Sequence, residues 1–236
     1  EQAQRKITQS LKLLGFVPAF FHGRGGSVSR GGAPTGRAIA AQPAGTLGGA
    51  MRTTEQGEVV SAKYANRGTA LNELEQLASS ALLQTALSVK APPTNPEYDN
   101  ALQALSGMSQ AAYCELLNAE GFVQYFKETS PVEELAMLKI GSRPARRFGA
   151  SSLADLRAIP WVFAWSQNRH LLTGWYGFGT ACQSFARVRG KDGQKMLKDM
   201  FSTNLLFQLM VDEVEKTLFQ TDMDIATQYA SLSTDA

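Results

Sequence analysis

One stretch limits the possible folds of this chain more than any other: residues Phe20–Gly32, which read FFHGRGGSVSRGG. Its glycines let the backbone approach a ligand closely, and its two arginines present planar guanidinium groups that suit phosphate or carboxylate. The preceding run, Val17–Phe21, is apolar apart from Pro18, and such a run predicts a buried strand. We therefore expect an anion-binding loop at the end of a strand, where α/β barrels and open α/β sheets carry their active sites.

The composition predicts a folded protein with a sizeable core. The chain has 236 residues, of which 44% are hydrophobic, which is enough for one large domain or two small ones. It shows no charged-then-apolar leader and no apolar run near the length of a membrane span, so we expect a cytoplasmic protein without membrane contact, or part of one. Cys114 and Cys182 lack the spacing of metal ligands, and we expect both to be free, buried thiols.

The charge is nearly neutral overall but unevenly distributed. The net charge is +2, and lysine and arginine concentrate in residues 22–67 and 139–169, whereas acidic residues dominate after residue 198. A uniformly basic surface would indicate nucleic acid, but two basic segments in a near-neutral chain favour one site for a small anion. We therefore expect no nucleic acid partner.

Helical periodicity dominates the first half of the sequence. Gln2–Leu14 is predicted to be a helix that ends at Gly15, and Thr46–Val60 is predicted to form an extended excursion or a second strand near Glu58–Val60. Arg67–Lys90 is strongly helical, and Glu97–Thr129 is helical with interruptions at its two glycines. We assign one apolar stripe of the Arg67–Lys90 helix to core packing: Leu71, Leu74, Ala78, Leu82 and Leu83.

The second half repeats the arrangement of a strand before an arginine loop. Met137–Ile140 is a short apolar piece that runs straight into GSRPARR. Trp161 and Trp165, four residues apart on one helical face, are assigned to packing. Ser202–Phe219 is predicted to be a helix with Ser202 as its N-cap. The expected balance is therefore mostly α-helix with a few short strands.

Two motif alternatives compete with a small-anion site. Gly31–Ala38 reads GGAPTGRA, which superficially matches a phosphate-binding loop, but Arg37 replaces the lysine and Ala38 lacks the hydroxyl that would hold magnesium, so we reject it. The repeated RGG resembles disordered RNA-binding segments, which are low-complexity tracts, whereas this one has apolar sequence on both sides. An RGG-type RNA-binding protein stays the alternative from another functional class. His170, away from these arginines, is expected to be a structural histidine.

Four segments taken together are more specific than any one of them. In order and spacing they resemble phosphoenolpyruvate carboxylase, of a bacterial, non-C4 type because Ala164 stands where the C4-plant forms have serine. The resemblance runs through nearly all of the chain and corresponds to a later portion of that large enzyme, without its N-terminal half and C-terminal end. The segments are FHGRGGSVSRGG from Phe21, TEQGEVV from Thr54, GSRPARR from Gly141 and LRAIPWVFAWSQNR from Leu156.

The resemblance implies a fold and an activity. Residues 1–236 would form a single region of the catalytic domain, with a few late parallel strands of an α/β (TIM-like) barrel and many additional helices. The family joins phosphoenolpyruvate to bicarbonate with Mg²⁺ or Mn²⁺, giving oxaloacetate and phosphate, which fixes carbon dioxide and replenishes the tricarboxylic acid cycle. It forms homotetramers in the cytoplasm. Its metal ligands belong to the portion before this chain, so no metal ligand is expected here.

The resemblance implies three catalytic residues. Arg30 matches the arginine that handles bicarbonate and carboxyphosphate, His22 stands where the family has its loop histidine, and Arg143 is similar to the active-site arginine of the GSRPA motif. Ser29 departs from the family pattern, which usually has glycine at that position, and this reduces the backbone freedom of the loop.

Three further residues are implied to bind substrate. Arg24 and Arg157 resemble the arginines that hold the substrate phosphate, and Gln56 corresponds to a glutamine implicated in substrate binding. The alternative for each arginine is a surface role or a pairing with a carboxylate, which we consider the weaker interpretation. For Gln56 the two interpretations are equally balanced.

Overall fold

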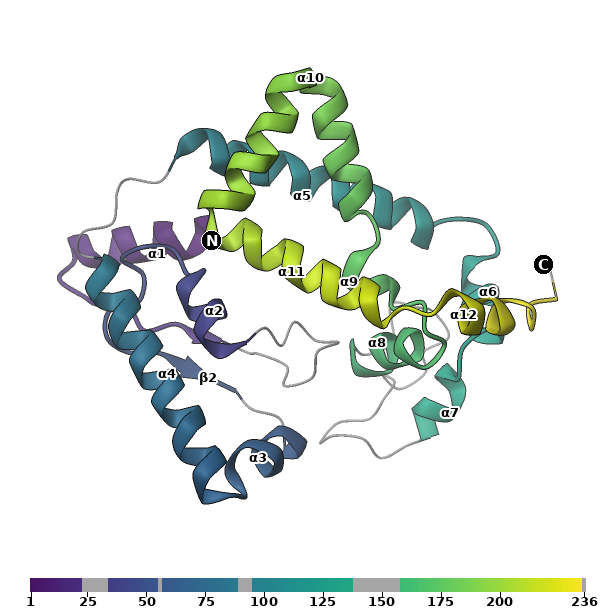
Figure 1. Ribbon diagram of the computed structural model, residues 1–236, viewed down its shortest axis with the longest axis horizontal. Coiled ribbons are helices and arrows are strands. Elements are labelled where there is room, and N and C mark those ends of the chain that lie inside the picture. Colours follow the sequence, from purple (N-terminus) through teal and green to yellow (C-terminus); the bar gives the residue numbers. More distant parts are fainter. Residues whose placement is uncertain (23–33, 55–56, 89–94, 138–157, 235–236) are drawn as a thin grey trace. The chain divides into compact units, whose positions relative to one another are not determined.

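The computed structural model describes residues 1–22, 34–54, 57–88, 95–137 and 158–234 (Figure 1). Within these ranges the chain is mostly helical, as predicted. No helix among the described residues is both long and apolar enough to cross a membrane. The chain divides into two compact units, of which the first comprises residues 1–95 and 201–210 and the second comprises residues 96–200 and 211–236.

The first and last helices of the first unit agree with the predicted ones more closely in their bounds than in their burial. The first helix ends as predicted, because Gly15 adopts a φ of 79°, which favours glycine. Its apolar residues nevertheless remain accessible, with Ile7 47% and Leu14 70% exposed. The described helices that lie wholly in this unit are α1 (Gln2–Leu13), α2 (Thr35–Ala40), α3 (Gly57–Tyr64) and α4 (Arg67–Ser88).

Two short parallel strands lie in the first unit. β1 (Phe21–His22) pairs with β2 (Arg52–Thr53), with Phe21 opposite Arg52 and His22 opposite Thr53. The strand predicted from Val17 onward is therefore shorter than expected, and it is not buried, since Phe21 is 65% exposed. The strand predicted near Glu58–Val60 is wrong, because these residues lie in α3. Two adjacent valines favour a strand only weakly, and the helix-forming residues that follow override that preference.

Helix α4 forms as predicted, but its leucines do not enter a core of this unit. Leu71, Leu74, Leu82 and Leu83 are 52–69% exposed, so their assignment to core packing is wrong within the described residues. The helix packs instead against α2 through another face. A Cβ atom added to Gly36 of α2 would lie 3.1 Å from the Ser80 hydroxyl, which shows how closely these two helices approach.

The second unit has a compact aromatic core. Trp165 and Phe126 are fully buried with their ring centroids 5.0 Å apart, and Phe122 stacks on Trp165 at 6.0 Å. Trp161 lies edge-on to Trp165 at 5.7 Å, so the assignment of both tryptophans to packing is confirmed. The described helices that lie wholly in this unit are α5 (Pro96–Leu117), α6 (Phe122–Glu128), α7 (Val132–Met137), α8 (Ala158–Gln167), α9 (Leu172–Trp175) and α12 (Met223–Ala230).

Two predictions about breaks in this unit are corrected. Helix α5 continues through Gly107 without interruption, whereas Gly121, with a φ of 78°, does separate α5 from α6. Met137, predicted to begin a strand, is the last residue of α7, and residues 138–140 of that prediction lie outside the described residues.

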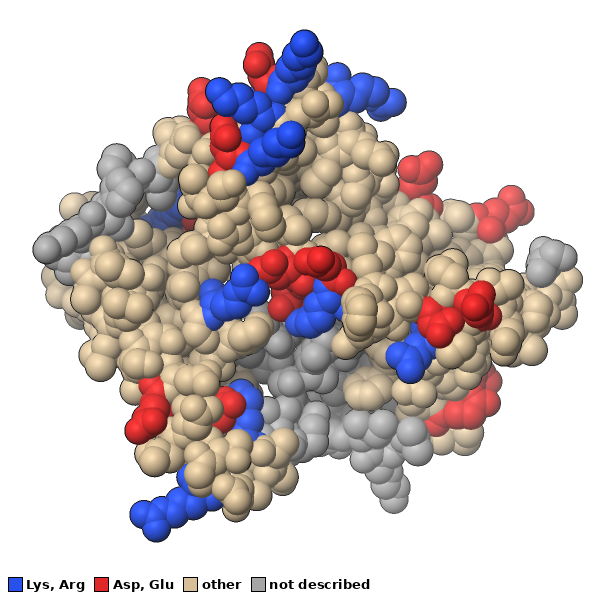
Figure 2. All heavy atoms as spheres, viewed as in Figure 1, with Lys and Arg blue, Asp and Glu red and all other residues tan. Residues whose placement is uncertain are grey.

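Helix α10 (Phe178–Thr203) is bent into two arms at Gly190, whose φ of 61° and ψ of −138° are not helical (Figure 1). Lysine and arginine side chains gather around this turn (Figure 2). The next helix, α11 (Leu205–Gln220), begins after Asn204, whose side-chain oxygen accepts a hydrogen bond from the backbone N–H of Phe207 at 2.8 Å. The prediction of Ser202 as N-cap is therefore wrong. Asparagine caps as well as serine does, and the preceding helix extends past Ser202.

Candidate functional site

The predicted site residues fall almost entirely outside the part of the chain that the structure describes. Arg24, Arg30, Gln56, Arg143 and Arg157 all lie in the segments that are not described, and their assignments remain predictions. The exception is the backbone of the sixth residue, His22, which forms the last position of β1.

The two paired strands end just before two of the segments that carry predicted site residues. β1 and β2 are parallel, so their carboxyl ends lie at the same edge, with His22 opposite Thr53. The first arginine loop follows directly after His22, and Gln56 follows three residues after Thr53. In α/β proteins this edge is where ligands bind. The expectation that a strand ends where the arginine loop begins is therefore confirmed. The structure adds a neighbouring strand, β2, that the sequence pattern missed.

Helix α8 begins at Ala158, directly after the predicted phosphate ligand Arg157, and polar contacts hold it near both ends. The indole N–H of Trp161 donates to the Tyr113 hydroxyl at 3.1 Å. Just beyond the helix, the fully buried Asn168 donates its amide to the backbone carbonyl of Thr129 at 3.1 Å. These contacts hold α8 against α5 and the α6–α7 connection.

His170 lies beside the aromatic core of the second unit. Its backbone N–H donates to the Asn168 side chain at 3.3 Å, and its carbonyl accepts from the Trp175 indole at 2.8 Å. Its ring meets Trp165 edge-on at 5.8 Å, and its buried Nδ1 has no partner among the described residues. Burial lowers the pKa of His170, because desolvation disfavours the imidazolium form. These contacts match the expected structural role, although the ring nitrogen lacks the hydrogen bond usual for such a histidine.

Other titratable groups of the second unit also have structural explanations. Burial raises the pKa of Tyr113, and it raises the pKa of the Cys182 thiol, which makes that thiol a weaker nucleophile at neutral pH. Both cysteines are free, as predicted, but Cys114 is exposed, so the expectation of burial is wrong for this residue. Within the described ranges, no group of three or more His, Cys, Asp or Glu side chains is arranged to hold a metal ion.

Among the described carboxylates, Glu128 has a clearly shifted pKa. The backbone N–H of Thr234 donates to this carboxylate at 2.9 Å, and the side chains of Gln124, Ser233 and Thr234 donate as well. These hydrogen bonds, led by that of the Thr234 backbone, lower the pKa of Glu128 to about 2. The carboxylate thereby fastens the residues after α12 to α6.

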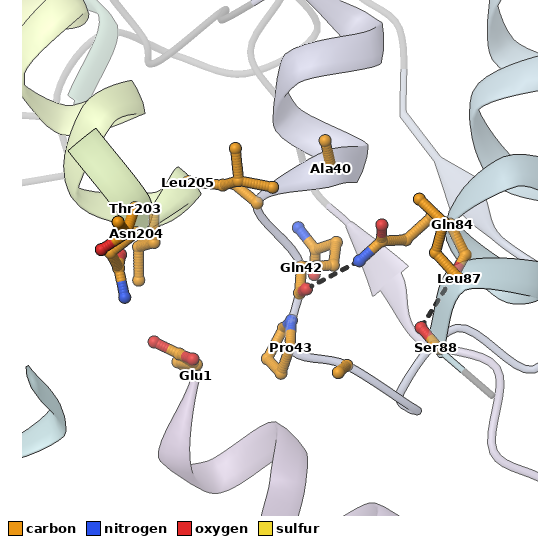
Figure 3. A pocket seen from close by; sticks show the side chains of 13 residues that line it. Glu1, Ala40, Gln42, Pro43, Gln84, Leu87, Ser88, Thr203, Asn204 and Leu205 are labelled. Atoms are coloured by element: carbon orange, nitrogen blue, oxygen red, sulfur yellow. Dashed lines mark hydrogen bonds between the residues drawn. The ribbon is translucent and has the colours of Figure 1, made fainter. Parts of the chain in front are cut away.

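The first unit also contains an open pocket of about 430 Å³ (Figure 3). It lies where α2 and α4 end and α11 begins. Its polar side chains are engaged with the protein: the Gln84 amide donates to the Gln42 carbonyl at 3.2 Å, and the Ser88 hydroxyl donates to the Gln84 carbonyl at 2.7 Å. Among the described residues that line this pocket, none belongs to β1 or β2.

Comparison with known proteins shows the family to which this chain belongs. The sequence model of the phosphoenolpyruvate carboxylase family matches residues 1–236, the whole of the chain. The chain belongs to the phosphoenolpyruvate carboxylase family. The resemblance noted in the four motif segments is thereby confirmed, and the RGG-type RNA-binding alternative receives no support.

Three curated relatives in the phosphoenolpyruvate carboxylase family illustrate the extent of the similarity. The phosphoenolpyruvate carboxylase of Methylorubrum extorquens is 58% identical over 236 residues, which is all of this chain and 26% of the relative. Those of Chromobacterium violaceum and Mycobacterium leprae are 42% and 40% identical over 99% of the chain and 26% of each relative. The chain therefore spans about a quarter of the length of the curated relatives it matches.

Proposed function

We propose that the full-length protein, meaning a protein of the relatives' length that contains this sequence, carboxylates phosphoenolpyruvate with bicarbonate to give oxaloacetate and phosphate. The observation that carries the proposal is the match of the entire chain to the phosphoenolpyruvate carboxylase family, with 58% identity to a curated relative of that name. Support also comes from the parallel strand pair, whose shared edge leads into the segments with Arg24, Arg30 and Gln56.

In this proposal the chain supplies the cationic part of the active site. Arg24 and Arg157 hold the phosphate of phosphoenolpyruvate, while Gln56 assists in binding the substrate. Arg30 retains bicarbonate and then carboxyphosphate, which breaks down to phosphate and the carbon dioxide that the enolate attacks. Phosphoenolpyruvate, bicarbonate, carboxyphosphate and the enolate are all anions, so fixed guanidinium donors stabilise the charge that develops during phosphoryl transfer and carboxylation. His22 and Arg143 complete the catalytic set.

The divalent metal of the reaction, Mg²⁺ or Mn²⁺, finds no ligand cluster in the described part of this chain. From the family relationship we propose that its ligands lie in the remainder of the full-length protein, and no step of the chemistry is assigned to a metal held here. When bound, the metal would stabilise the charge of the enolate.

The same proposal covers the wider setting of the protein. Residues 1–236 belong to one catalytic region and contribute late strands and surrounding helices of an α/β barrel, of which β1 and β2 are the described strands. The full-length protein is a cytoplasmic homotetramer that replenishes the tricarboxylic acid cycle, without a nucleic acid or membrane partner. Support for these features comes from the family relationship.

The deciding experiment separates the two half-reactions in the full-length protein. With Arg30→Ala, oxaloacetate formation should fall by roughly 100- to 1,000-fold, because one preorganised donor is removed. Some bicarbonate-dependent release of phosphate should persist, because the first phosphoryl transfer can still proceed while carboxyphosphate is mishandled. Arg37→Ala, on the exposed surface of α2, is the matched control. Carboxylation by Arg30→Ala within a few-fold of the unchanged protein would overturn the role of Arg30.

The 236-residue chain alone should produce no oxaloacetate from phosphoenolpyruvate, bicarbonate and Mg²⁺ or Mn²⁺. Groups that act on one transition state are strongly non-additive when some are removed, so arginines without the metal site should not sustain turnover. Turnover comparable with that of the full-length protein would mean that the metal ligands lie within this chain.

A further inference from the structure

Helix α4 turns its less apolar side toward the rest of the first unit. With about 100° of rotation per residue, its half-buried positions fall on one continuous face. Only one leucine lies on this face, and the other positions carry small or polar side chains. The half-buried residues are Ala70, Glu73, Leu77, Ser80, Ala81, Gln84, Thr85 and Ser88.

Polar contacts contribute to holding this face in place. Gln84 donates its side-chain amide to the carbonyl of Gln42 at 3.2 Å, and Thr85 donates its hydroxyl to the carbonyl of Leu47 at 3.3 Å. Both acceptors belong to the segment after α2. The orientation of α4 is therefore specified by hydrogen bonds to that segment, and the leucines are left on other faces.

The leucines beside this face form a stripe. Leu71, Leu74, Ala78 and Leu82 follow each other at intervals of three and four residues, so they share one side of the helix. The three leucines are 56%, 52% and 69% exposed, and Ala78 is exposed as well. We call these four residues the leucine stripe. A soluble protein does not usually leave such a row accessible, because apolar patches of this kind mark binding surfaces.

The dimensions of the leucine stripe suit one packed helix. From Leu71 to Leu82 it extends about 16 Å along α4, and rows of side chains at these intervals are the ridges that interlock with grooves of another helix. A fully exposed leucine offers on the order of 100 Å² to a partner, so the stripe offers roughly 200 to 300 Å². Each partner in a standard protein–protein interface buries about 800 Å². The stripe alone is therefore too small for a stable contact between two separate molecules.

We propose that the leucine stripe is the docking face for a helix from the part of the full-length polypeptide outside residues 1–236. The curated relatives match this chain from end to end, yet the chain spans only 26% of their length, so nearly three quarters of such a polypeptide lies elsewhere. A contact within one polypeptide does not pay the entropy of bringing two molecules together, and a small apolar area is sufficient for it. This inference is independent of the catalytic roles proposed above.

The first test compares two cysteine variants of neighbouring residues in the full-length protein. Ala78→Cys lies in the leucine stripe, whereas Ser79→Cys lies about 100° farther around α4, on an exposed polar position. Maleimide labelling, followed peptide by peptide by mass spectrometry, should be about tenfold or more slower at residue 78 than at residue 79, because a docked helix excludes the reagent. Equal rates at the two positions, with the circular dichroism of the unchanged protein, would overturn the proposal.

The second test identifies what covers the leucine stripe. Leu82 is replaced by the photoreactive residue benzoylphenylalanine in the full-length protein, and ¹⁴N- and ¹⁵N-labelled preparations are mixed, allowed to exchange subunits and irradiated. We expect cross-links within single-isotope polypeptides to a segment outside residues 1–236. Mixed-isotope cross-links would assign the face to a second copy, and cross-links to residues within 1–236 would assign it to this chain itself. Either result would overturn the proposal, as would the absence of any cross-link to protein.

Discussion

Helices α4 and α8 carry the same kind of sequence pattern but differ in what covers their apolar residues. On α8, Trp161 and Trp165 are four residues apart, and Trp165 is 0% exposed among rings from α6. On α4, Leu71 and Leu82 keep similar helical intervals, and Leu82 is 69% exposed. Periodicity therefore predicts that a helix face will be covered, but it does not predict which part of the polypeptide covers it.

The polar residues of the two helices complete the comparison. Next to α8, the buried Asn168 ties the end of the helix to the α6–α7 connection and supports an apolar core. On α4, Gln84 and Thr85 are themselves part of the inner contact surface. In this chain the polar contacts lie at the edge of the apolar core beside α8, but within the inner contact surface of α4.

The largest expected effect is at the centre of the α8 core. Trp165→Ala should lower the free energy of unfolding of the 236-residue chain by about 3–5 kcal/mol, because it removes a fully buried ring and leaves a cavity. Urea unfolding followed by circular dichroism measures this loss. Trp165→Phe keeps a ring and removes an indole N–H that has no partner among the described residues, so its cost should be smaller. A loss below about 1 kcal/mol for Trp165→Ala would show that the apolar face of α8 is no better covered within this chain than that of α4.

A medium effect is expected from the polar tie of α8. Asn168→Ala should cost about 1–3 kcal/mol, because the Thr129 carbonyl and the His170 N–H both lose their partner. Asn118→Ala, at an exposed position after α5, is the control and should change stability by less than about 0.5 kcal/mol. Equal effects of the two substitutions would mean that aromatic packing alone holds α8.

A smaller effect is expected from the pH dependence of the same core. The pKa of His170 is lowered from 6.5 in the folded chain, so the unfolded chain binds the proton more readily. The stability from neutral His170 is complete above pH 6.5 and is lost as the pH falls through the lowered pKa, below which the loss levels off. NMR titration of the ring should give a pKa below 6.5, and His170→Gln should flatten this part of the stability profile. A measured pKa at or above 6.5 would contradict the burial of the ring beside Trp165.

The smallest effect is expected on α4 in the isolated chain. Leu82→Ser should change the unfolding free energy of the 236-residue chain by no more than about 0.5 kcal/mol, since the side chain is largely exposed there. Leu77→Ser, the same substitution on the half-buried face, is the matched control and should cost more. A larger loss for Leu82→Ser than for Leu77→Ser would show that the leucine stripe is already covered within this chain.

The bounds of the helices could be predicted from the sequence better than the segments that pack against them. Gly15 and the bounds of α1 and α4 follow from local backbone preferences, which act in the same way in any surroundings. The predicted strand near Glu58–Val60 and the N-cap at Ser202 failed, because in each case a competing local preference was of similar strength. The burial of α4 could not be predicted, since it depends on which segments fold against it.

The site was predicted by motif rather than by geometry. The order and spacing of four motif segments were specific enough to identify the family, which the match over residues 1–236 confirms. The pairing of β1 with β2 could not be predicted, because two residues per strand leave no periodic pattern. The roles of Arg24, Arg30, Gln56, Arg143 and Arg157 stay predictions, with their residues outside the described ranges.

The bend of α10 has a practical consequence for protein engineering. Residues 187–192 are exposed, whereas Phe185 and Gly193 on either side are buried between the two arms. Exposed turns between packed elements are the positions where proteins best accept inserted sequence. A short peptide tag placed between Lys191 and Asp192 should therefore project from the turn and leave the arms packed. Gly190 itself must be kept, because its positive φ is unfavourable for any other residue, so the insertion has a defined boundary on its N-terminal side.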